Sequence, residues 1–387
     1  MHRLAGKRQK GLGHYIILIV IALAVVVYLI PIYWIIVTSL KSPSDIVTKV
    51  PKFLFRITWE NYQKLMPVGI PPILYIFLVE ALLGILLVCL SLKKDVVVAR
   101  MLVLVGSIVF VLTSFYAFIS TMNFNFLMLI VYVVAFYWLI RKTTTGVKQP
   151  LLIFGSLVAF SLVAVCAVLA GAGSKYFHQL LNSIVIGFGS TILAVGLGTF
   201  SAYAFSRFEV LGKEDLLFFI LSTRMLPPVV VVIPVYLMYS KLGLRDTHLG
   251  LILLYTTFNL SFAVWLMKGF IDEIPKEYED AALVDGYTRF QSFFKVVFPQ
   301  SVTGIAATAV FCLITAWNEF AFALVLTEVG GKAVTAPPSI TSATGSGGVD
   351  WGMIAAKTFI FLLPVAVFTF LMRKHLLRGV TFGAVKR

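Results

Sequence analysis

The sequence predicts an all-α, polytopic membrane protein. Of its 387 residues, 60% are hydrophobic and 13% are charged, and a mean hydropathy of +0.97 is too high for a water-soluble surface. The apolar residues fall in runs of about 20, the length that crosses a bilayer as a helix. The net charge of +15 comes from basic residues that lie between these runs, so it indicates membrane topology rather than nucleic acid binding. The three cysteines lie inside apolar runs, so no disulfide framework is expected.

Ten runs are predicted to be transmembrane helices, at 15–38, 70–92, 101–121, 124–140, 151–171, 179–205, 216–239, 249–270, 302–327 and 353–372. The first follows a basic tail, but it is too long for a signal peptide and no small-residue cleavage pattern closes it. We therefore interpret it as a retained anchor. The seventh is interrupted by Arg224 and three prolines, so we expect a broken helix there.

The distribution of basic residues predicts the orientation of the chain. If the N-terminus is cytoplasmic, 21 of the 32 Lys and Arg residues lie inside and 9 outside. Lysine and arginine in short loops resist translocation, so both termini and the 271–300 loop are expected in the cytoplasm.

No catalytic, metal or nucleotide-binding signature is recognisable. The five histidines are scattered, and Gly330-Gly331-Lys332 is followed by Ala333 instead of the Ser or Thr of a phosphate-binding loop. We therefore expect no metal site and no ATP hydrolysis by this chain. The pair of glycines at 187 and 189 lacks the strand that precedes a dinucleotide fingerprint. It fits better into a ridge of small residues that lets another helix approach closely, formed by Gly187, Ser190, Ala194, Gly198 and Ala202.

The hydrophilic loop at 271–300 predicts a helix, a sharp turn and a second helix. Pro275 suits a first helical turn, and Gly286 can end a helix in the left-handed conformation. Negative charge early in a helix is favoured by the helix dipole. Glu277, Glu279 and Asp280 place this charge in the first turns of the predicted helix. A further acid, Asp285, lies just before Gly286.

The second helix has its own start and stop signals. Thr288 and Gln291 have the spacing of a capping box, and Pro299 is expected to stop or kink this helix where it enters the membrane. The small Ala281 and Ala282 beside the acids would let a partner protein pack closely. An amphipathic connector on the lipid surface is the alternative, but an anionic inner leaflet repels acidic residues.

The loop resembles a known sequence motif. Asp280-Ala281-Ala282, three residues, Gly286, nine residues and Val296-Val297-Phe298-Pro299 are similar to the "EAA" loop of permease subunits in ATP-binding-cassette (ABC) importers. Further segments resemble the second permease subunit of the maltose-type carbohydrate subgroup: Ser39-Leu40-Lys41, Leu181-Asn182-Ser183, Leu226-Pro227-Pro228, Ile233-Pro234, Leu242-Gly243-Leu244, Trp317-Asn318-Glu319-Phe320 and the C-terminal 378–386. The resemblance covers roughly 1–66 and 175–387.

This resemblance implies the type I ABC importer permease fold and an assembly in which transport and ATP hydrolysis belong to different subunits. The chain would be a non-hydrolytic permease in a bacterial inner membrane, importing a sugar, oligosaccharide or polyol. Its partners would be a second homologous permease subunit, two copies of an ATP-binding subunit that holds ATP and Mg²⁺, and an external solute-binding protein. Residues 275–286 would be the coupling helix. The residues implied in coupling are Glu277, Glu279, Asp280, Ala281, Ala282, Asp285, Gly286 and Pro299.

The family pattern has six spans, so 67–174 is an insertion with four extra hydrophobic segments. An even number leaves the downstream orientation unchanged. Its only ionisable group in mid-span is Glu80, and polar intramembrane groups mark transport pathways. We therefore favour a lipid-facing or partner-binding bundle over a second pore.

Four residues of the family-like spans are candidates for an intramembrane ion pair or for the solute pathway. Glu319 and Lys357 are expected at similar depth, and we predict that they form an ion pair, because an unpaired charge in the membrane is expensive. Pairing is preferred to solute contact. Asn318 is a pathway candidate beside Glu319, and Arg224 either lines the cavity or binds a carbonyl.

The sequence argues against two other classes of function. A stand-alone secondary transporter or channel needs ion-coupling acids or a symmetric repeat, and a membrane enzyme needs clustered catalytic acids. Neither ion-coupling acids nor a symmetric repeat is recognisable, and the acidic cluster at 277–285 lies on the face expected to dock a protein. The Gly-, Ser- and Pro-rich loop at 328–350 is expected outside, where it either reaches into the binding protein or is a solvated linker.

Overall fold

The computed structural model describes residues 12–48, 50, 52–53, 55–66, 174–345 and 348–382. In this part of the chain four helices are long and apolar enough to span a membrane, and two bent helix pairs raise the number to as many as six. They correspond to the predicted first span and the predicted sixth to tenth spans. The other four predicted spans, with Glu80, lie outside the described residues, so the total of ten stays a prediction.

The chain divides into two compact units. Unit 1 joins 1–65 to 343–360 and contains α1 (Leu12–Ser39), α2 (Pro43–Ile46), α3 (Glu60–Gln63), the two-residue strands β1 (Thr344–Gly345) and β2 (Gly348–Val349), and the start of α18 (Trp351–Phe382). The strands pair antiparallel. In this unit the buried Asn61 donates from Nδ2 to the carbonyls of Ser39 and Lys41, both at 2.9 Å, which fixes the chain where it leaves α1.

Unit 2 holds the remaining described elements. They are α8 (Lys175–Arg207), α9 (Lys213–Ser222), η1 (Thr223–Met225), α10 (Pro228–Leu242), α11 (His248–Asp272), α12 (Glu277–Val284), α13 (Arg289–Ser292), the π-helix η2 (Phe293–Val297), α14 (Phe298–Gln300), α15 (Val302–Trp317), α16 (Ala321–Leu326) and α17 (Ala336–Thr341), followed by the rest of α18.

Prolines explain the two bent spans. The predicted break in the seventh span is confirmed, since α9 with η1 meets α10 at 92°. Leu226 and Pro227 are extended because a residue before proline avoids the helical conformation. A second bend, of 72°, separates α13–α14 from α15 at Ser301, two residues after Pro299, close to the predicted position.

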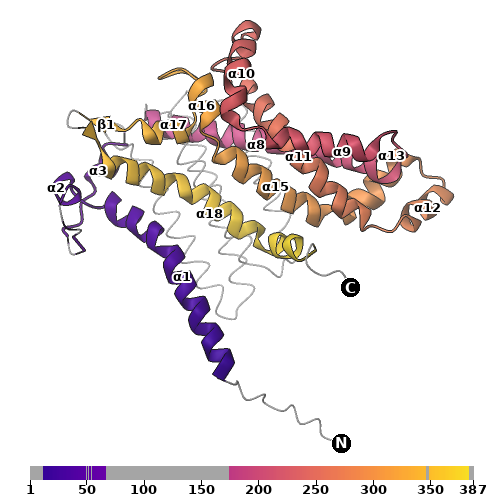
Figure 1. Ribbon diagram of the computed structural model, residues 1–387, viewed down its shortest axis with the longest axis horizontal. Helices are drawn as coiled ribbons and strands as arrows, with labels where there is room; N and C mark the ends of the chain where they lie inside the picture. The colour runs from indigo at the N-terminus through magenta and orange to yellow at the C-terminus, as the bar shows by residue number, and fades with distance from the viewer. Residues whose placement is uncertain are drawn as a thin grey trace, which may run out of the picture. The chain divides into compact units, whose positions relative to one another are not determined.

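Helix α8 packs along α11, and α15 packs against both (Figure 1). The predicted ridge of small residues lies at these contacts, and all five of its members are buried. At Gly198 the approach is closest, because an added Cβ would lie 2.7 Å from the Cβ of Ala263 on α11. The absence of a side chain at this position therefore permits the α8–α11 contact.

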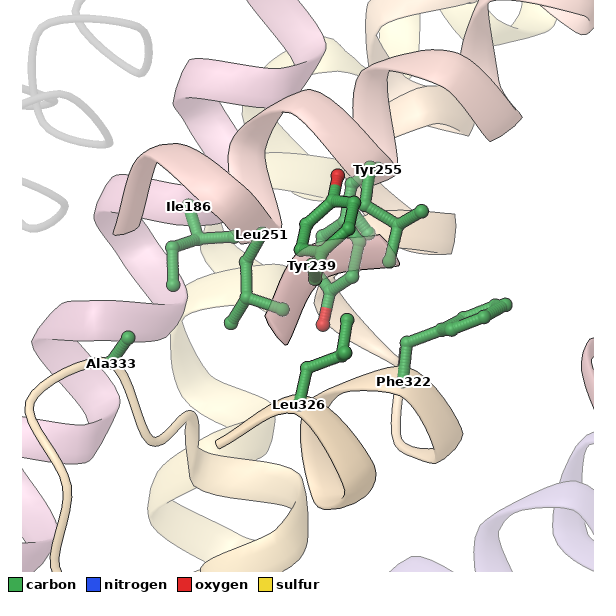
Figure 2. Close-up of a cluster of buried hydrophobic side chains, with 9 residues drawn as sticks. Ile186, Tyr239, Leu251, Tyr255, Phe322, Leu326 and Ala333 are labelled. Carbon is green, nitrogen blue, oxygen red and sulfur yellow. The ribbon is translucent and has the colours of Figure 1, made fainter. Parts of the chain in front are cut away.

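A hydrophobic cluster joins five helices of unit 2. Figure 2 shows Ile186 of α8, Tyr239 of α10 and Leu251 of α11 near Leu326 of α16. The buried Tyr239 hydroxyl donates to the carbonyl of Gly250 at 3.2 Å, which satisfies its polar group inside this cluster. The cluster thus holds the short α16 against the α8–α11 pair.

Candidate functional site

The candidate site is the loop between α11 and α15, whose ends are set by local sequence. Helix α12 ends at Gly286, which has φ +85°, a conformation that residues with a Cβ resist. The Gly286 N–H donates to Leu283 O and the Tyr287 N–H to Ala282 O, both at 3.0 Å. These are the two hydrogen bonds of a Schellman motif, so the predicted glycine stop is confirmed.

The turn into the next helix is also as predicted. Thr288 accepts a hydrogen bond from the backbone N–H of Gln291 at 3.2 Å, and the Gln291 side chain accepts from the Thr288 N–H at 2.9 Å. This capping box satisfies two donors that a helix start leaves free. The chain therefore turns between the capped end of α12 and the capped start of α13.

A buried ion pair fastens α12 to α8. Glu279 accepts hydrogen bonds from the Arg207 guanidinium and, at 2.9 Å, from the Tyr203 hydroxyl. Arg207 also donates to the carbonyl of Ile274 at 2.8 Å, just before α12. Both side chains of the pair are only 4% exposed. Removing one member would leave a buried charge without its partner, which costs about 3–5 kcal/mol.

An apolar cluster supports this ion pair. Ile271 at the end of α11 and Ile274 in the loop pack with Phe293 and Val297 of η2 and with Tyr203 of α8. Phe293 and Val297 lie in the π-helical turn, a form that often occurs at functional sites. The segments before and after α12 therefore pack into the same apolar cluster.

The opposite face of α12 is exposed and acidic. Glu277, Asp280, Ala281 and Asp285 are exposed, so the small Ala281 lies among carboxylates, as expected for a docking surface. Two predicted contact residues are oriented differently: Glu279 is 3% exposed and Ala282 is 5% exposed. Both pack against their own chain and fasten the helix, and their predicted part in coupling to an ATPase subunit stays a prediction. Gly286 and Pro299 are exposed.

Glu319 lies at the break between α15 and α16. Its carboxylate accepts hydrogen bonds from the Tyr255 hydroxyl at 2.8 Å and from the backbone N–H groups of Phe322 and Ala323 at 2.9 and 3.0 Å. It thus caps α16 and ties this short helix to α11. Lys357 belongs to unit 1 and Glu319 to unit 2, so their pairing stays a prediction.

The other two intramembrane candidates also have contacts. The Arg224 guanidinium carbon lies 4.7 Å from the centre of the Phe262 ring, a cation–π contact between η1 and α11. Asn318 is exposed and donates from Nδ2 to the carbonyl of Ile314 at 2.9 Å. Arg224 is exposed as well. Both side chains therefore present polar groups on the surface of the spanning helices.

A polar network that the sequence analysis did not predict lies at the other end of α8 and α11. Asp246, at φ +51°, accepts from the backbone N–H groups of Lys332 and Ala333 at 2.8 and 3.2 Å. Asn182 donates to the carbonyl of Lys332 at 2.9 Å and contacts His248 Nε2 at 2.8 Å. The network fixes the base of the predicted external loop. Asn182 belongs to a segment that carried the resemblance, but its partners are 66 and 150 residues away.

Among the described residues no three His, Cys, Asp or Glu side chains are grouped so that they could hold a metal ion. The polar groups of the loop are instead arranged as a fastened helix with one free acidic face. Such an arrangement can transmit force between proteins.

Comparison with known proteins agrees with this architecture. Residues 194–380 match the family described as "Binding-protein-dependent transport system inner membrane component". The chain is 39% identical over 216 residues to the trehalose transport system permease protein SugB of Mycobacterium tuberculosis, covering 55% of this chain and 78% of the relative. It is 29% identical over 263 residues to the trehalose/maltose transport system permease protein MalG of Thermococcus litoralis, covering 67% and 94%.

A solved structure is similar as well. A chain of a bacterial ABC transporter involved in the import of the acidic polysaccharide alginate is 21% identical, with a TM-score of 0.45, covering 56% of this chain and 79% of the other.

Proposed function

The chain belongs to the family of inner-membrane components of binding-protein-dependent transport systems, and from this premise we propose that it is the permease subunit of an ABC importer for a sugar, oligosaccharide or polyol. Its named relatives transport trehalose or trehalose and maltose, which supports a carbohydrate substrate. The finer proposal is that α12 is the coupling helix, which docks on a separate ATPase.

The exposed acidic face of α12 is the observation that carries the coupling proposal. Asp280 and Ala281 point away from the chain, while Glu279 on the same helix is bonded to Arg207 of α8. A helix fastened in this way cannot yield when a partner pushes on its free face. Movement of the ATPase would therefore pass to α8 and α11, the long helices to which the loop is attached.

The proposed assembly has four kinds of component. This chain pairs with a second homologous permease, two copies of an ATP-binding subunit bind ATP and Mg²⁺ and dock at the coupling helices, and an external solute-binding protein delivers the substrate. The chain itself hydrolyses nothing. We propose that it lies in the bacterial inner membrane with both termini and α12 on the cytoplasmic side, as the distribution of basic residues favours.

The intramembrane residues fit a solute pathway in this assembly. Arg224 and Asn318 are exposed within predicted spans that are largely apolar, and exposed polar groups in a membrane face a water-filled cavity or another helix. We propose that these two side chains face the pathway, whereas Glu319, which caps α16, stabilises the break between two helices.

The experiment that tests coupling compares two charge reversals in the reconstituted importer. Asp280→Lys places a cation at the centre of the acidic face, and like charges facing across an interface cost several kcal/mol. In this variant we expect the stimulation of ATP hydrolysis and of uptake by loaded binding protein to fall at least about tenfold. This corresponds to a loss of about 1.4 kcal/mol or more. The control is Asp215→Lys, an exposed aspartate at the start of α9. Gly286→Pro should behave like Asp280→Lys, because proline cannot adopt φ +85°.

Membrane insertion should be normal in all three variants. If Asp280→Lys kept both ATP hydrolysis and uptake at the level of Asp215→Lys, α12 would not be the coupling helix. If the purified chain moved solute without an ATPase, the proposal of an ABC permease subunit would be refuted as well.

A further inference from the structure

The segment after the coupling helix carries an exposed aromatic stripe that docking of α12 does not use. We call Tyr287–Gln300 the return arm, because it leads from α12 back to α15. Phe290, Phe294 and Phe298 follow one another at a spacing of four and are 68%, 42% and 40% exposed. Their ring centroids are 4.7 and 6.1 Å apart in succession. Contiguous exposed rings of this kind indicate a surface that is covered in the working protein.

The stripe continues onto an exposed apolar face of a membrane-spanning helix. The ring of Phe294 lies 6.1 Å from that of Phe200 on α8, which is itself 48% exposed. Further along α8, Leu197 and Ile192 are also exposed. Such side chains on a spanning helix are suited to the acyl chains of lipid. The aromatic stripe thus continues the exposed apolar surface of α8 toward the end of the span.

The charges of the return arm are opposite to those of the coupling helix. Arg289 and Lys295 are exposed, and the arm contains no Asp or Glu. Both cations lie beside aromatic rings: Arg289 is 5.8 Å from the Phe208 ring, and Lys295 is 4.2 Å from the Tyr287 ring. An anionic membrane surface attracts basic side chains and repels acidic ones. The return arm is therefore suited to lipid and α12 to a protein partner.

We propose that the return arm lies in the inner leaflet of the membrane. The three phenylalanine rings of the stripe lie among the upper parts of the acyl chains, and Arg289 and Lys295 bind the phosphates of anionic phospholipids. The inference rests on the cytoplasmic placement of the loop in the proposed function. It goes further by giving the two halves of the loop different partners.

The test measures the depth of the arm in the complete chain. A nitroxide spin label is attached to Phe290→Cys, and in a matched control to Val284→Cys, an 88% exposed position on α12, after replacement of the native cysteines. The chain is reconstituted in vesicles of phosphatidylcholine with and without phosphatidylglycerol. Relaxation by oxygen reports lipid exposure, and relaxation by a water-soluble nickel chelate reports water exposure. We expect oxygen to dominate at 290 in vesicles with phosphatidylglycerol and the nickel chelate to dominate at 284.

The charges are tested with the double variant Arg289→Gln/Lys295→Gln. Each basic residue near an anionic surface contributes about 1 kcal/mol, so we expect the ratio of lipid-exposed to water-exposed label at 290 to fall about 30-fold at low ionic strength. The matched control is Lys213→Gln/Lys276→Gln, which removes two cations from the same side of the chain outside the arm. This control should leave the ratio unchanged.

Two other results at position 290 would contradict the inference. A label at 290 that both reagents reach poorly would show that a protein, such as the second permease, covers the stripe, and a label that the nickel chelate reaches well would show open solvent. Either result overturns the inference. Reaction of the cysteine at 284 with an impermeant thiol reagent in right-side-out vesicles would instead refute the cytoplasmic placement. The failure of the proposed topology is thus distinguished from the failure of the lipid inference.

Discussion

Breaking the ion pair between Arg207 and Glu279 should release α12, the proposed coupling helix, from α8. Glu279→Gln removes the negative charge while keeping the size of the side chain, and Arg207→Gln removes the positive one. In each single variant one buried charge loses its partner, with a cost of about 3–5 kcal/mol. In the double variant no unpaired charge is left, so we expect it to be more stable than the single variants.

Local opening of the loop is the quantity to measure. When opening is fast relative to cleavage, the rate of proteolysis follows the population of the open form. A loss of about 3 kcal/mol raises that population more than about 100-fold, because each 1.4 kcal/mol is a factor of ten. Trypsin cleavage after Lys276 and Arg289 in membrane vesicles should therefore accelerate by at least this factor in the Glu279→Gln variant.

A second ion pair provides the control. Lys268 and Asp272 are paired at i, i+4 near the end of α11, with side chains 20% and 42% exposed. Such pairs contribute about 0.3–0.5 kcal/mol, so Lys268→Gln should change the cleavage rate by less than about threefold. If Glu279→Gln accelerated cleavage no more than Lys268→Gln, or if the effects of the Arg207 and Glu279 variants were simply additive, the ion pair would not fasten the loop.

Three further predictions concern single positions. Gly286→Ala forces a Cβ into the left-handed region and should destabilise the loop by about 1–2 kcal/mol, seen as faster tryptic cleavage, whereas Gly269→Ala in the last turn of α11 should not. Gly198→Ala should lower the thermal stability of the detergent-purified protein by about 1–3 kcal/mol, because the added Cβ meets α11. Gly196→Ala should be neutral or slightly stabilising, because a Cβ added there has no neighbour within 4 Å. Equal effects of the two variants would refute the close helix contact. Glu319→Gln weakens charge-assisted hydrogen bonds to α16 and to Tyr255, so we expect a loss of about 1.5–3 kcal/mol in thermal stability. The substrate preference should be unchanged. A changed preference in competition uptake would indicate solute contact instead.

Sequence reasoning located the main elements because their signals are local. A run of about 20 apolar residues has few structures available in a membrane other than a helix. The stop at Gly286 and the capping box of Thr288 and Gln291 each involve residues within five positions of one another, and the structure confirms both. For the same reason the breaks caused by proline were predictable. The inserted segment 67–174 offered apolar runs but no local signal that indicates a function.

The tertiary structure decided which side of α12 is free. The sequence places acids at several positions of an eight-residue helix, and nothing in that pattern distinguishes Glu279 from Asp280. The distinction comes from Arg207 and Tyr203, which lie 72 and 76 residues earlier in the chain. These residues reach α12 only because α8 and α11 pack side by side, and such a contact follows from the whole arrangement of helices. By itself, the sequence determined where the helices and turns lie, since these depend on neighbouring residues. The partner of each buried charge was decided only when distant helices came together.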